Sequence, residues 1–270
     1  MFEEQFNTPI KPTWCPGCGN FGIWLALKKT FTRLKWQAGD FNVVYDIGCS
    51  GNMGDFLTVH GFHSLHGRAI PAAVGMRLAD PSKPVVVVTG DGGAYGEGGN
   101  HLLAACRGNF DVTVLVHDNR VYGLTTGQAS PTSPQGYQSK STPQGTVEVP
   151  LNPLALAVSQ GATFVAQGFA GEAVQLNELI LLAIKHEGFS LVNILQPCVT
   201  FNAVNTYEHY REKIYKIEKP LMNKKLALNE LIDNPKIPTG VIYCRPRPTY
   251  ESYLPKKKEV DFGALLEEFK

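Results

Sequence analysis

Two short polar motifs each follow a run of apolar, mostly β-branched residues, a pattern typical of side chains placed at strand ends. Gly90-Asp91-Gly92 follows the run at 85–89, and Asp118-Asn119 follows the run at 112–117. Asn119 lies 28 residues beyond Asp91, as expected for one strand–helix–strand unit, so both side chains should meet at one sheet edge. There they can bind one hard cation, most simply Mg²⁺, together with a diphosphate. Either motif alone is also common turn chemistry, so the prediction depends on the pair.

Four of the six cysteines stand where they could bind a metal centre. Cys15 and Cys18 form a pair with two residues between them, Cys49 follows a predicted strand, and Cys198 ends another apolar run. Four thiolates fit zinc or an iron–sulfur cluster equally well on composition. A redox disulfide or ordinary buried thiols are the alternatives. The remaining two cysteines are interpreted as structural: Cys106 and Cys244.

Competing motifs are incomplete. The glycine pattern at 17–22 matches a dinucleotide-binding fingerprint but does not follow a strand, and no P-loop signature is present. The segment 48–52 resembles a nucleophile elbow, yet its last glycine comes one position early. His60, His63 and His66 could place two rings on one metal, but no carboxylate accompanies them. We expect His60 and His63 to be solvated or packed.

The elements that must position these residues alternate along the chain. Short apolar runs predict strands at 41–47, 84–89, 111–117 and 190–195. Apolar residues at helical spacing predict helices at 18–34, 68–79, 97–107 and 171–187. This alternation indicates an α/β fold, with a mostly parallel sheet covered by helices on both faces.

Two other segments differ from this pattern. Residues 124–150 are rich in Ser, Thr, Pro, Gln and Gly, and a stretch of that length favours a lid or binding loop. Beyond residue 199 we expect a helical pattern at 206–234, a proline-rich stretch, and the basic run Lys256-Lys257-Lys258. The surplus of basic residues after residue 200 suits a solvated surface, or a site where a partner protein docks.

Composition limits the class of protein. The 270 residues carry a formal net charge of +1 with 18% charged residues, which makes nucleic acid an unexpected partner. The first residues are acidic where a secretory signal would be basic, and no apolar run approaches the ~20 residues of a membrane span. We therefore expect a cytoplasmic protein without a membrane partner.

Taken together, the motifs resemble one family, the β subunits of 2-oxoacid:ferredoxin oxidoreductases. The matching segments occur in the order of that family, and Cys198 is a later match. They are Trp14-Cys15-Pro16-Gly17-Cys18-Gly19, Ile47-Gly48-Cys49-Ser50-Gly51, His66-Gly67-Arg68-Ala69-Ile70-Pro71, Gly90-Asp91-Gly92 and Asp118-Asn119-Arg120-Val121-Tyr122-Gly123-Leu124-Thr125.

The resemblance implies a thiamine diphosphate-binding fold with N- and C-terminal extensions. Residues 1–200 would form the cofactor-binding domain, and 201–270 an extension that packs on it or on the partner subunit. A [4Fe-4S] cluster would be held by Cys15, Cys18, Cys49 and Cys198. Mg²⁺ would be held by Asp91, Asn119 and the carbonyl group of Val121. The cofactor would contact Ile47, Gly48, Cys49, Ser50, His66, Gly92, Gly93, Gly123 and Leu124.

The implied activity is oxidative decarboxylation of a 2-oxoacid to acyl-CoA and CO₂, dependent on thiamine diphosphate and coenzyme A, with electrons passing through the cluster to ferredoxin. His66 would lie close to the reacting centre. In this family the glutamate that activates the cofactor comes from the α (or fused γα) subunit, and Glu97 is too close to the glycine turn to replace it. We therefore expect an obligate heteromer. The basic residues after residue 200 would then suit docking of acidic ferredoxin or of the α chain.

Thr126 bears on the choice of substrate. Some broad-specificity relatives carry a lysine there that could pair with a second carboxylate, so threonine favours pyruvate or 2-oxobutyrate over 2-oxoglutarate. Two other classes remain open. A non-oxidative thiamine decarboxylase or carboligase would not need the cysteines, and a zinc-stabilised binding module would not need the Asp91 and Asn119 pair.

Overall fold

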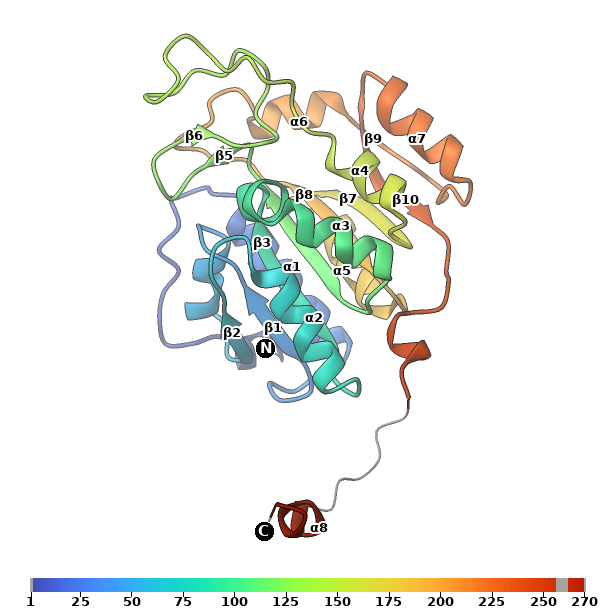
Figure 1. Ribbon diagram of the computed structural model, residues 1–270. Coiled ribbons are helices and arrows are strands. Elements are labelled where there is room, and N and C mark those ends of the chain that lie inside the picture. The colour runs from blue at the N-terminus through green and yellow to red at the C-terminus, as the bar shows by residue number, and fades with distance from the viewer. Residues whose placement is uncertain (1, 256–261, 270) are drawn as a thin grey trace.

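The computed structural model describes residues 2–255 and 262–269, so the basic run at 256–258 lies outside the described residues. Its centre is an eight-stranded sheet in the order β2-β1-β3-β4-β8-β7-β10-β9, in which β10 runs antiparallel to β7 (Figure 1). The strands are β1 Asn42–Tyr45, β2 His60–His63, β3 Val85–Gly90, β4 Thr113–Asp118, β7 Phe164–Phe169, β8 Ser190–Leu195, β9 Ile214–Lys216 and β10 Ile237–Cys244. Two short strands, β5 Val121–Tyr122 and β6 Gln128–Ala129, form a separate hairpin.

Helices cover both faces of the sheet, and the strand sequences explain why. In β3, alternate valines point to opposite faces: Val86 and Val88 pack in one apolar cluster, and Val85 and Val87 in the other. The first cluster includes residues of α1 Asn20–Arg33 and α5 Ala173–Lys185. The second includes residues of α2 Ala69–Ala79, α3 Gly99–Gly108, α4 Pro153–Gln160 and α7 Lys224–Asp233. A strand that is buried on both sides therefore reads as a continuous apolar run.

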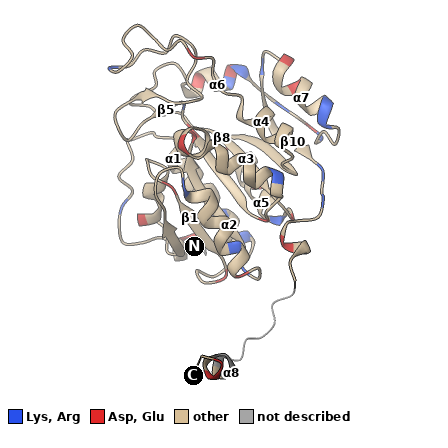
Figure 2. Ribbon diagram, in the orientation of Figure 1, with Lys and Arg blue, Asp and Glu red and all other residues tan. Residues whose placement is uncertain are grey.

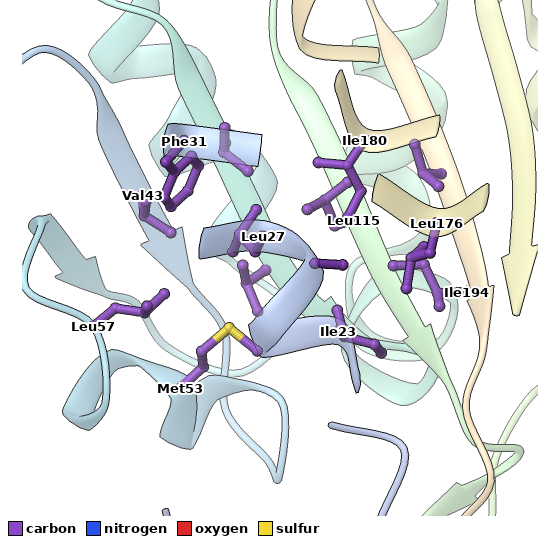
Figure 3. Packing of buried hydrophobic residues seen from close by; sticks show 14 of the residues in the cluster. Ile23, Leu27, Phe31, Val43, Met53, Leu57, Leu115, Leu176, Ile180 and Ile194 are labelled. Atoms are coloured by element: carbon purple, nitrogen blue, oxygen red, sulfur yellow. The ribbon is translucent and has the colours of Figure 1, made fainter. Parts of the chain in front are cut away.

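Figure 3 shows the first cluster from close by. Ile23, Leu27 and Phe31 of α1 recur at helical spacing, and Phe31 lies beside Val43 of β1. Leu176 and Ile180 of α5 lie over Leu115 and Ile194, which belong to β4 and β8. These contacts pack α5 onto β8 and onto β4, whose end carries the Asp118-Asn119 motif.

The predicted α/β fold is confirmed, and so are its four predicted strands and four predicted helices. The helical interpretation of 206–234 is wrong as one element, because the segment contains α6 Tyr207–Lys213, then β9, then α7. Thr206 and Asn223 accept N-terminal backbone hydrogen bonds of α6 and α7, so two helix starts lie within the pattern. The proline-rich stretch contains β10, in which Gly240 has a φ of 112° beside a bulge. From the segment expected as a C-terminal extension, β9 and β10 continue the sheet.

The remaining elements are short. They are the helical turns η1 Phe2–Phe6, η2 Gly51–Asp55, η3 Gly92–Glu97 and η4 Glu251–Tyr253, and the C-terminal helix α8 Phe262–Glu267.

Acidic and basic residues are mixed on α6 and α7 (Figure 2). Among the described residues, no helix has the length and apolar character needed to cross a membrane.

The carboxyl ends of four neighbouring strands meet at one edge of the sheet. Asp46 follows β1, Asp91 follows β3, Asn119 follows β4 and Gln196 follows β8, and these four strands are consecutive in the sheet. In open parallel sheets this edge is where ligands bind. The topology therefore gathers the polar motifs as the sequence predicted.

Candidate active site

Asp46 ties together three segments at this edge. Its carboxylate is buried, and Oδ1 accepts the backbone N–H groups of Ile47 and Gly67, both at 2.8 Å. Oδ2 accepts the hydroxyl group of Thr89 at 2.7 Å. A buried carboxylate with several donors stays in place and holds its donors in place. Asp46 thus fixes the turn after β1 relative to the end of β3.

The glycines after β3 are required because other groups approach the backbone closely. A Cβ atom at Gly93 would lie 2.0 Å from Asp46 Oδ2, and one at Gly92 would lie 2.2 Å from a ring carbon of Tyr122. The chain continues as η3, one turn of π-helix, a form that often occurs at functional sites. Its first N–H groups lack helical partners, so they suit an anion.

Asp91 is a second buried carboxylate of the site. Its Oδ2 accepts the hydroxyl groups of Ser130 at 2.5 Å and Thr132 at 2.8 Å. Thr132 also lies 2.8 Å from Asp118 Oδ1. Burial, and then the charge of Asp118, raise the pKa of Asp91 well above its usual range. A positive charge beside Asp91 would offset both effects.

Asn119 holds the start of the β5–β6 hairpin. Its Oδ1 accepts the backbone N–H of Val121 at 3.0 Å, and its backbone carbonyl accepts Asn202 Nδ2 at 3.0 Å. Arg120, between Asn119 and Val121, has a φ of 60°, a left-handed conformation that this tight turn imposes. The turn brings Val121 and Gly123 back to the sheet edge.

These segments enclose a cavity of about 230 Å³. The cavity is lined by every cofactor-contacting residue that the resemblance implied: Ile47, Gly48, Cys49, Ser50, His66, Gly92, Gly93, Gly123 and Leu124. Asp91, Asn119 and Val121 line it too. Thr126 does not line it, whereas the neighbouring Thr125 does. Thr126 has a φ of 77°, so the hairpin tip turns at this residue.

Some polar atoms around this cavity are buried and have no partner. They include Ser50 Oγ and His117 Nε2, and both side chains line the cavity. His117 Nδ1 is within 2.8 Å of Asn20 Oδ1, which holds the ring in place. Buried polar groups are rarely left unpaired in a native protein. These atoms therefore mark a place for a polar ligand.

His66 lies at the edge of the cavity between two carboxylates. Its Nε2 is 3.2 Å from Glu97 Oε2, and its Nδ1 is 3.7 Å from Asp46 Oδ1. The hydroxyl group of Tyr122 donates to the same Glu97 carboxylate at 3.1 Å. Glu97 itself does not line the cavity, so it orients His66 and Tyr122 from outside.

The four cysteines singled out in the sequence line a second cavity, of about 240 Å³. Gly17, with a φ of 83°, turns the chain so that the N–H of Cys18 bonds to the carbonyl of Cys15. The N–H of Gly19 donates to the carbonyl of Pro197, next to Cys198. Trp14 Nε1 donates to the carbonyl of Cys49 at 2.6 Å. These bonds join the three chain segments that carry the cysteines.

The two cavities share one wall. It contains Cys49, Asn119, Gly123, Leu124 and Gln196, which line both cavities. A Cβ atom at Gly123 would lie 3.6 Å from Cys198 Sγ and 3.7 Å from Cys49 Sγ. Groups bound in the two cavities would therefore be separated by a single layer of atoms.

Several residues of the site were not predicted. Asp46 lies near the end of the predicted strand at 41–47, and in the structure it follows β1 just as Asp91 follows β3, so that position could have identified it. Ser130 and Thr132 lie in the segment expected to be a lid, and no local pattern marks them as partners of Asp91. The lid interpretation is wrong for residues 130–133, because Ser130, Thr132 and Ser133 are buried beneath the site.

The other two cysteines and the remaining histidines lie elsewhere. Cys106 is fully buried on α3, and Cys244 ends β10. His60 and His63 belong to β2, where His63 Nε2 is 2.9 Å from the carbonyl of Asp46. Within the described part of the chain, no three His, Cys, Asp or Glu side chains are arranged to hold one metal ion together.

Comparison with known proteins gives the family. Residues 46–194 match the thiamine pyrophosphate enzyme, C-terminal TPP binding domain, and residues 198–259 match the C-terminal region of the pyruvate ferredoxin oxidoreductase beta subunit. A 2-oxoacid:ferredoxin oxidoreductase subunit beta from Sulfolobus sp is 44% identical over 261 residues, covering 90% of this chain and 86% of that protein. The beta subunit of 2-oxoacid:ferredoxin oxidoreductase 1 from Aeropyrum pernix is 41% identical, covering 94% and 84%.

A solved structure that covers the whole chain is similar to it. It is the 2-oxoglutarate:ferredoxin oxidoreductase from Magnetococcus marinus with 2-oxoglutarate, coenzyme A and succinyl-CoA bound. The TM-score is 0.93 at 36% identity, covering 100% of this chain and 96% of the other. The chain therefore belongs to the thiamine diphosphate-binding β subunits of the 2-oxoacid:ferredoxin oxidoreductases.

Proposed function

We propose that this β subunit, with a partner α subunit, converts a 2-oxoacid, coenzyme A and oxidised ferredoxin into acyl-CoA, CO₂ and reduced ferredoxin. Two electrons leave the substrate, and one-electron carriers must accept them in turn. The observation that carries the proposal is the shared wall, in which Cys49 and Asn119 line both cavities. A decarboxylation site and an electron acceptor would then lie on the two sides of one wall.

The first cavity fits Mg²⁺ and a diphosphate. Asp91, Asn119 Oδ1 and the carbonyl of Val121 are hard oxygen donors, the kind that Mg²⁺ prefers. Ser130 and Thr132 both donate to Asp91 Oδ2 and so orient the carboxylate. Because Asp91 is buried beside Asp118, a cation there would supply the missing positive charge.

Thiamine diphosphate, when bound, supplies the electron sink that decarboxylation of a 2-oxoacid needs. The chain's own residues bind and orient it. The unpaired hydroxyl group of Ser50 and the N–H groups after Asp91 offer donors to the phosphates. His66, held by Glu97, is placed to hydrogen-bond the substrate carboxylate at the mouth of the cavity.

The second cavity fits a cluster better than a single ion. Cys15, Cys18, Cys49 and Cys198 surround about 240 Å³ of space, and within the described chain no three such side chains converge on one point. A zinc site would bring four thiolates to about 2.3 Å from one atom. The arrangement thus supports a [4Fe-4S] cluster over the zinc-stabilised module.

The chain's part of the cofactor site lacks an activating acid. Among the described residues, no glutamate belongs to the lining of the first cavity, and Glu97 is engaged by His66 and Tyr122. This supports a glutamate supplied by the α subunit. The β chain alone should then bind cofactor weakly and show no turnover.

Two observations bear on the choice of substrate, and they favour different 2-oxoacids. No Lys or Arg of the described chain lines the first cavity, so it offers no fixed cation to a second carboxylate, which favours pyruvate or 2-oxobutyrate. The relative from Magnetococcus marinus is named for 2-oxoglutarate, which favours that acid instead. The kcat/KM values of the α–β complex for pyruvate and 2-oxoglutarate decide between them. A higher value for 2-oxoglutarate would overturn the first preference.

The proposed function is tested by anaerobic assay of the α–β complex. Acyl-CoA formation and ferredoxin reduction should both require the 2-oxoacid and coenzyme A. Formation of CO₂ and an aldehyde without ferredoxin reduction would instead indicate the non-oxidative decarboxylase.

A further inference from the structure

Gln196 occupies a particular place between the two cavities. It follows β8, only 1% of its surface is exposed, and it lines both cavities. Its backbone N–H donates to the carbonyl of Asp118 at 2.9 Å, which continues the ladder between β8 and β4. The side chain therefore starts from a rigid point of the sheet.

Hydrogen bonds fix the orientation of the Gln196 amide group. Nε2 donates to the carbonyl of Pro197 at 2.9 Å and to Cys18 Sγ at 3.3 Å. Because a carbonyl oxygen only accepts, the amide must present its NH₂ group on this side. A rotated amide would set two oxygen atoms against each other. The N–H···S contact with Cys18 thus follows from the bond to Pro197.

The surrounding chain leaves room for this contact. A Cβ atom at Gly19 would lie 2.8 Å from Gln196 Cγ and 3.1 Å from Pro197 Cδ. Any larger residue at position 19 would displace the glutamine from Cys18. Gln196 Oε1 is buried and has no partner, so holding the NH₂ group in this orientation costs desolvation of the oxygen.

The contact with Cys18 differs in kind from the other hydrogen bonds to these cysteines. Cys198 interacts with backbone N–H groups of the segment 200–202, which any residue other than proline would supply. The bond from Gln196 comes from a side chain, so a single substitution removes it. The hydrogen bond to Cys18 Sγ therefore depends on which residue occupies position 196.

We propose that Gln196 is a positioning residue whose Nε2–H group, through Cys18, raises the reduction potential of the iron–sulfur cluster. This inference rests on the proposed function, which places the cluster on the four cysteines. Reduction adds one electron and hence one negative charge, and an N–H donor stabilises a thiolate ligand more as its charge increases. Outer hydrogen bonds of this kind tune metal centres. The bond makes the cluster a better acceptor for electrons from the neighbouring site.

The test uses the α–β complex, purified without oxygen, with three variants of this chain. Gln196→Met removes the donor at similar volume, and Gln196→Glu also places an acceptor beside the sulfur. The control, Gln160→Met, makes the same substitution on α4, at a residue that lines neither cavity. Iron content, visible absorbance and the midpoint potential from a redox titration followed by electron paramagnetic resonance are measured for each.

In Gln196→Met, the ratio of reduced to oxidised cluster at a fixed solution potential should fall about tenfold, equivalent to about 59 mV for one electron. Gln196→Glu should shift the potential further in the same direction, and Gln160→Met should leave it unchanged. Equal midpoint potentials in all complexes that carry the cluster would contradict the proposed role of Gln196 but not the proposed cluster. A complex without iron or sulfide would overturn the proposed cluster, and this inference with it.

Discussion

Thr132 Oγ1 lies 2.8 Å from Asp91 Oδ2, although 41 residues separate them. The same oxygen is 2.8 Å from Asp118 Oδ1, yet one hydroxyl group carries a single proton. The two carboxylates therefore compete for one donor. Thr132 orients the carboxylate to which it donates, which links the loop after β6 to the proposed metal site.

Substitution of Thr132 tests this link. Thr132→Val keeps the shape and removes the donor, so Asp91 should bind Mg²⁺ and the diphosphate more weakly. A hydrogen bond to a charged group contributes about 2 kcal/mol, so cofactor affinity should fall roughly 30-fold. Titration calorimetry of the α–β complex with thiamine diphosphate and Mg²⁺ measures it. Thr132→Ser, which keeps a hydroxyl group, should stay within about threefold, and equal losses in both variants would contradict the link.

The glycine at position 93 should tolerate no side chain. In Gly93→Ala the new Cβ atom would meet Asp46 Oδ2 at 2.0 Å, so the carboxylate must move and release its donors. We expect a loss of about 2 kcal/mol in the free energy of unfolding, together with loss of cofactor binding.

Gly75→Ala is the matched control, because it lies inside α2 with nothing within 4 Å of the new Cβ atom. It should raise the free energy of unfolding by about 0.5–1 kcal/mol. Denaturant unfolding of the β chain measures both variants. Equal changes would contradict the close approach of Gly93 to Asp46.

The cysteines should divide into two groups. Cys18→Ser should abolish most of the visible absorbance and iron content, because the sulfur would be a cluster ligand. Cys244→Ser should change neither, since Cys244 lies at the end of β10, away from the second cavity. Iron and sulfide analysis of the two purified variants checks this. Retention of the full cluster by the Cys18 variant would exclude Cys18 as a ligand.

His186 should contribute to stability near neutral pH and should lose that contribution in mild acid. Burial lowers the pKa of this histidine, and its Nε2 lies 2.8 Å from Thr163 Oγ1. Below the unfolded pKa of about 6.5, the unfolded chain binds more protons than the folded chain, so acid favours unfolding. The slope of the free energy of unfolding against pH, measured in urea between about pH 7 and pH 5, includes this contribution. His186→Gln should reduce that slope; an unchanged slope would show that other groups cause it.

The sequence predicted the elements whose signals are local. Four valines before Gly90 and the apolar run before Asp118 indicated β3 and β4, because strands buried on both faces read as apolar runs. The cavity residues followed from motifs that stand at those strand ends. Asp46 could have been added because it occupies the same kind of position.

Other features depend on contacts between distant segments, which one sequence does not reveal. The bonds from Ser130 and Thr132 to Asp91, and from Gln196 to Cys18, link residues about 40 to 180 positions apart. Strand β10 was hard to predict because it contains Pro238, a residue that strands rarely accommodate away from a sheet edge. In the structure β10 is the strand next to the edge of the sheet. In 206–234, helical propensity continued across β9, and the pairing with β10 decided the structure.

The proposed function depends above all on the wall that a decarboxylation site and an electron acceptor would share in this chain. It is tested by the visible and electron paramagnetic resonance spectra of the α–β complex, mixed without oxygen with a 2-oxoacid and coenzyme A. We predict that the broad visible absorbance of the complex bleaches and a signal of a reduced cluster appears, and that the β chain alone shows neither change. Bleaching by the β chain alone, or acyl-CoA formation while the spectrum stays constant, would contradict the proposed function.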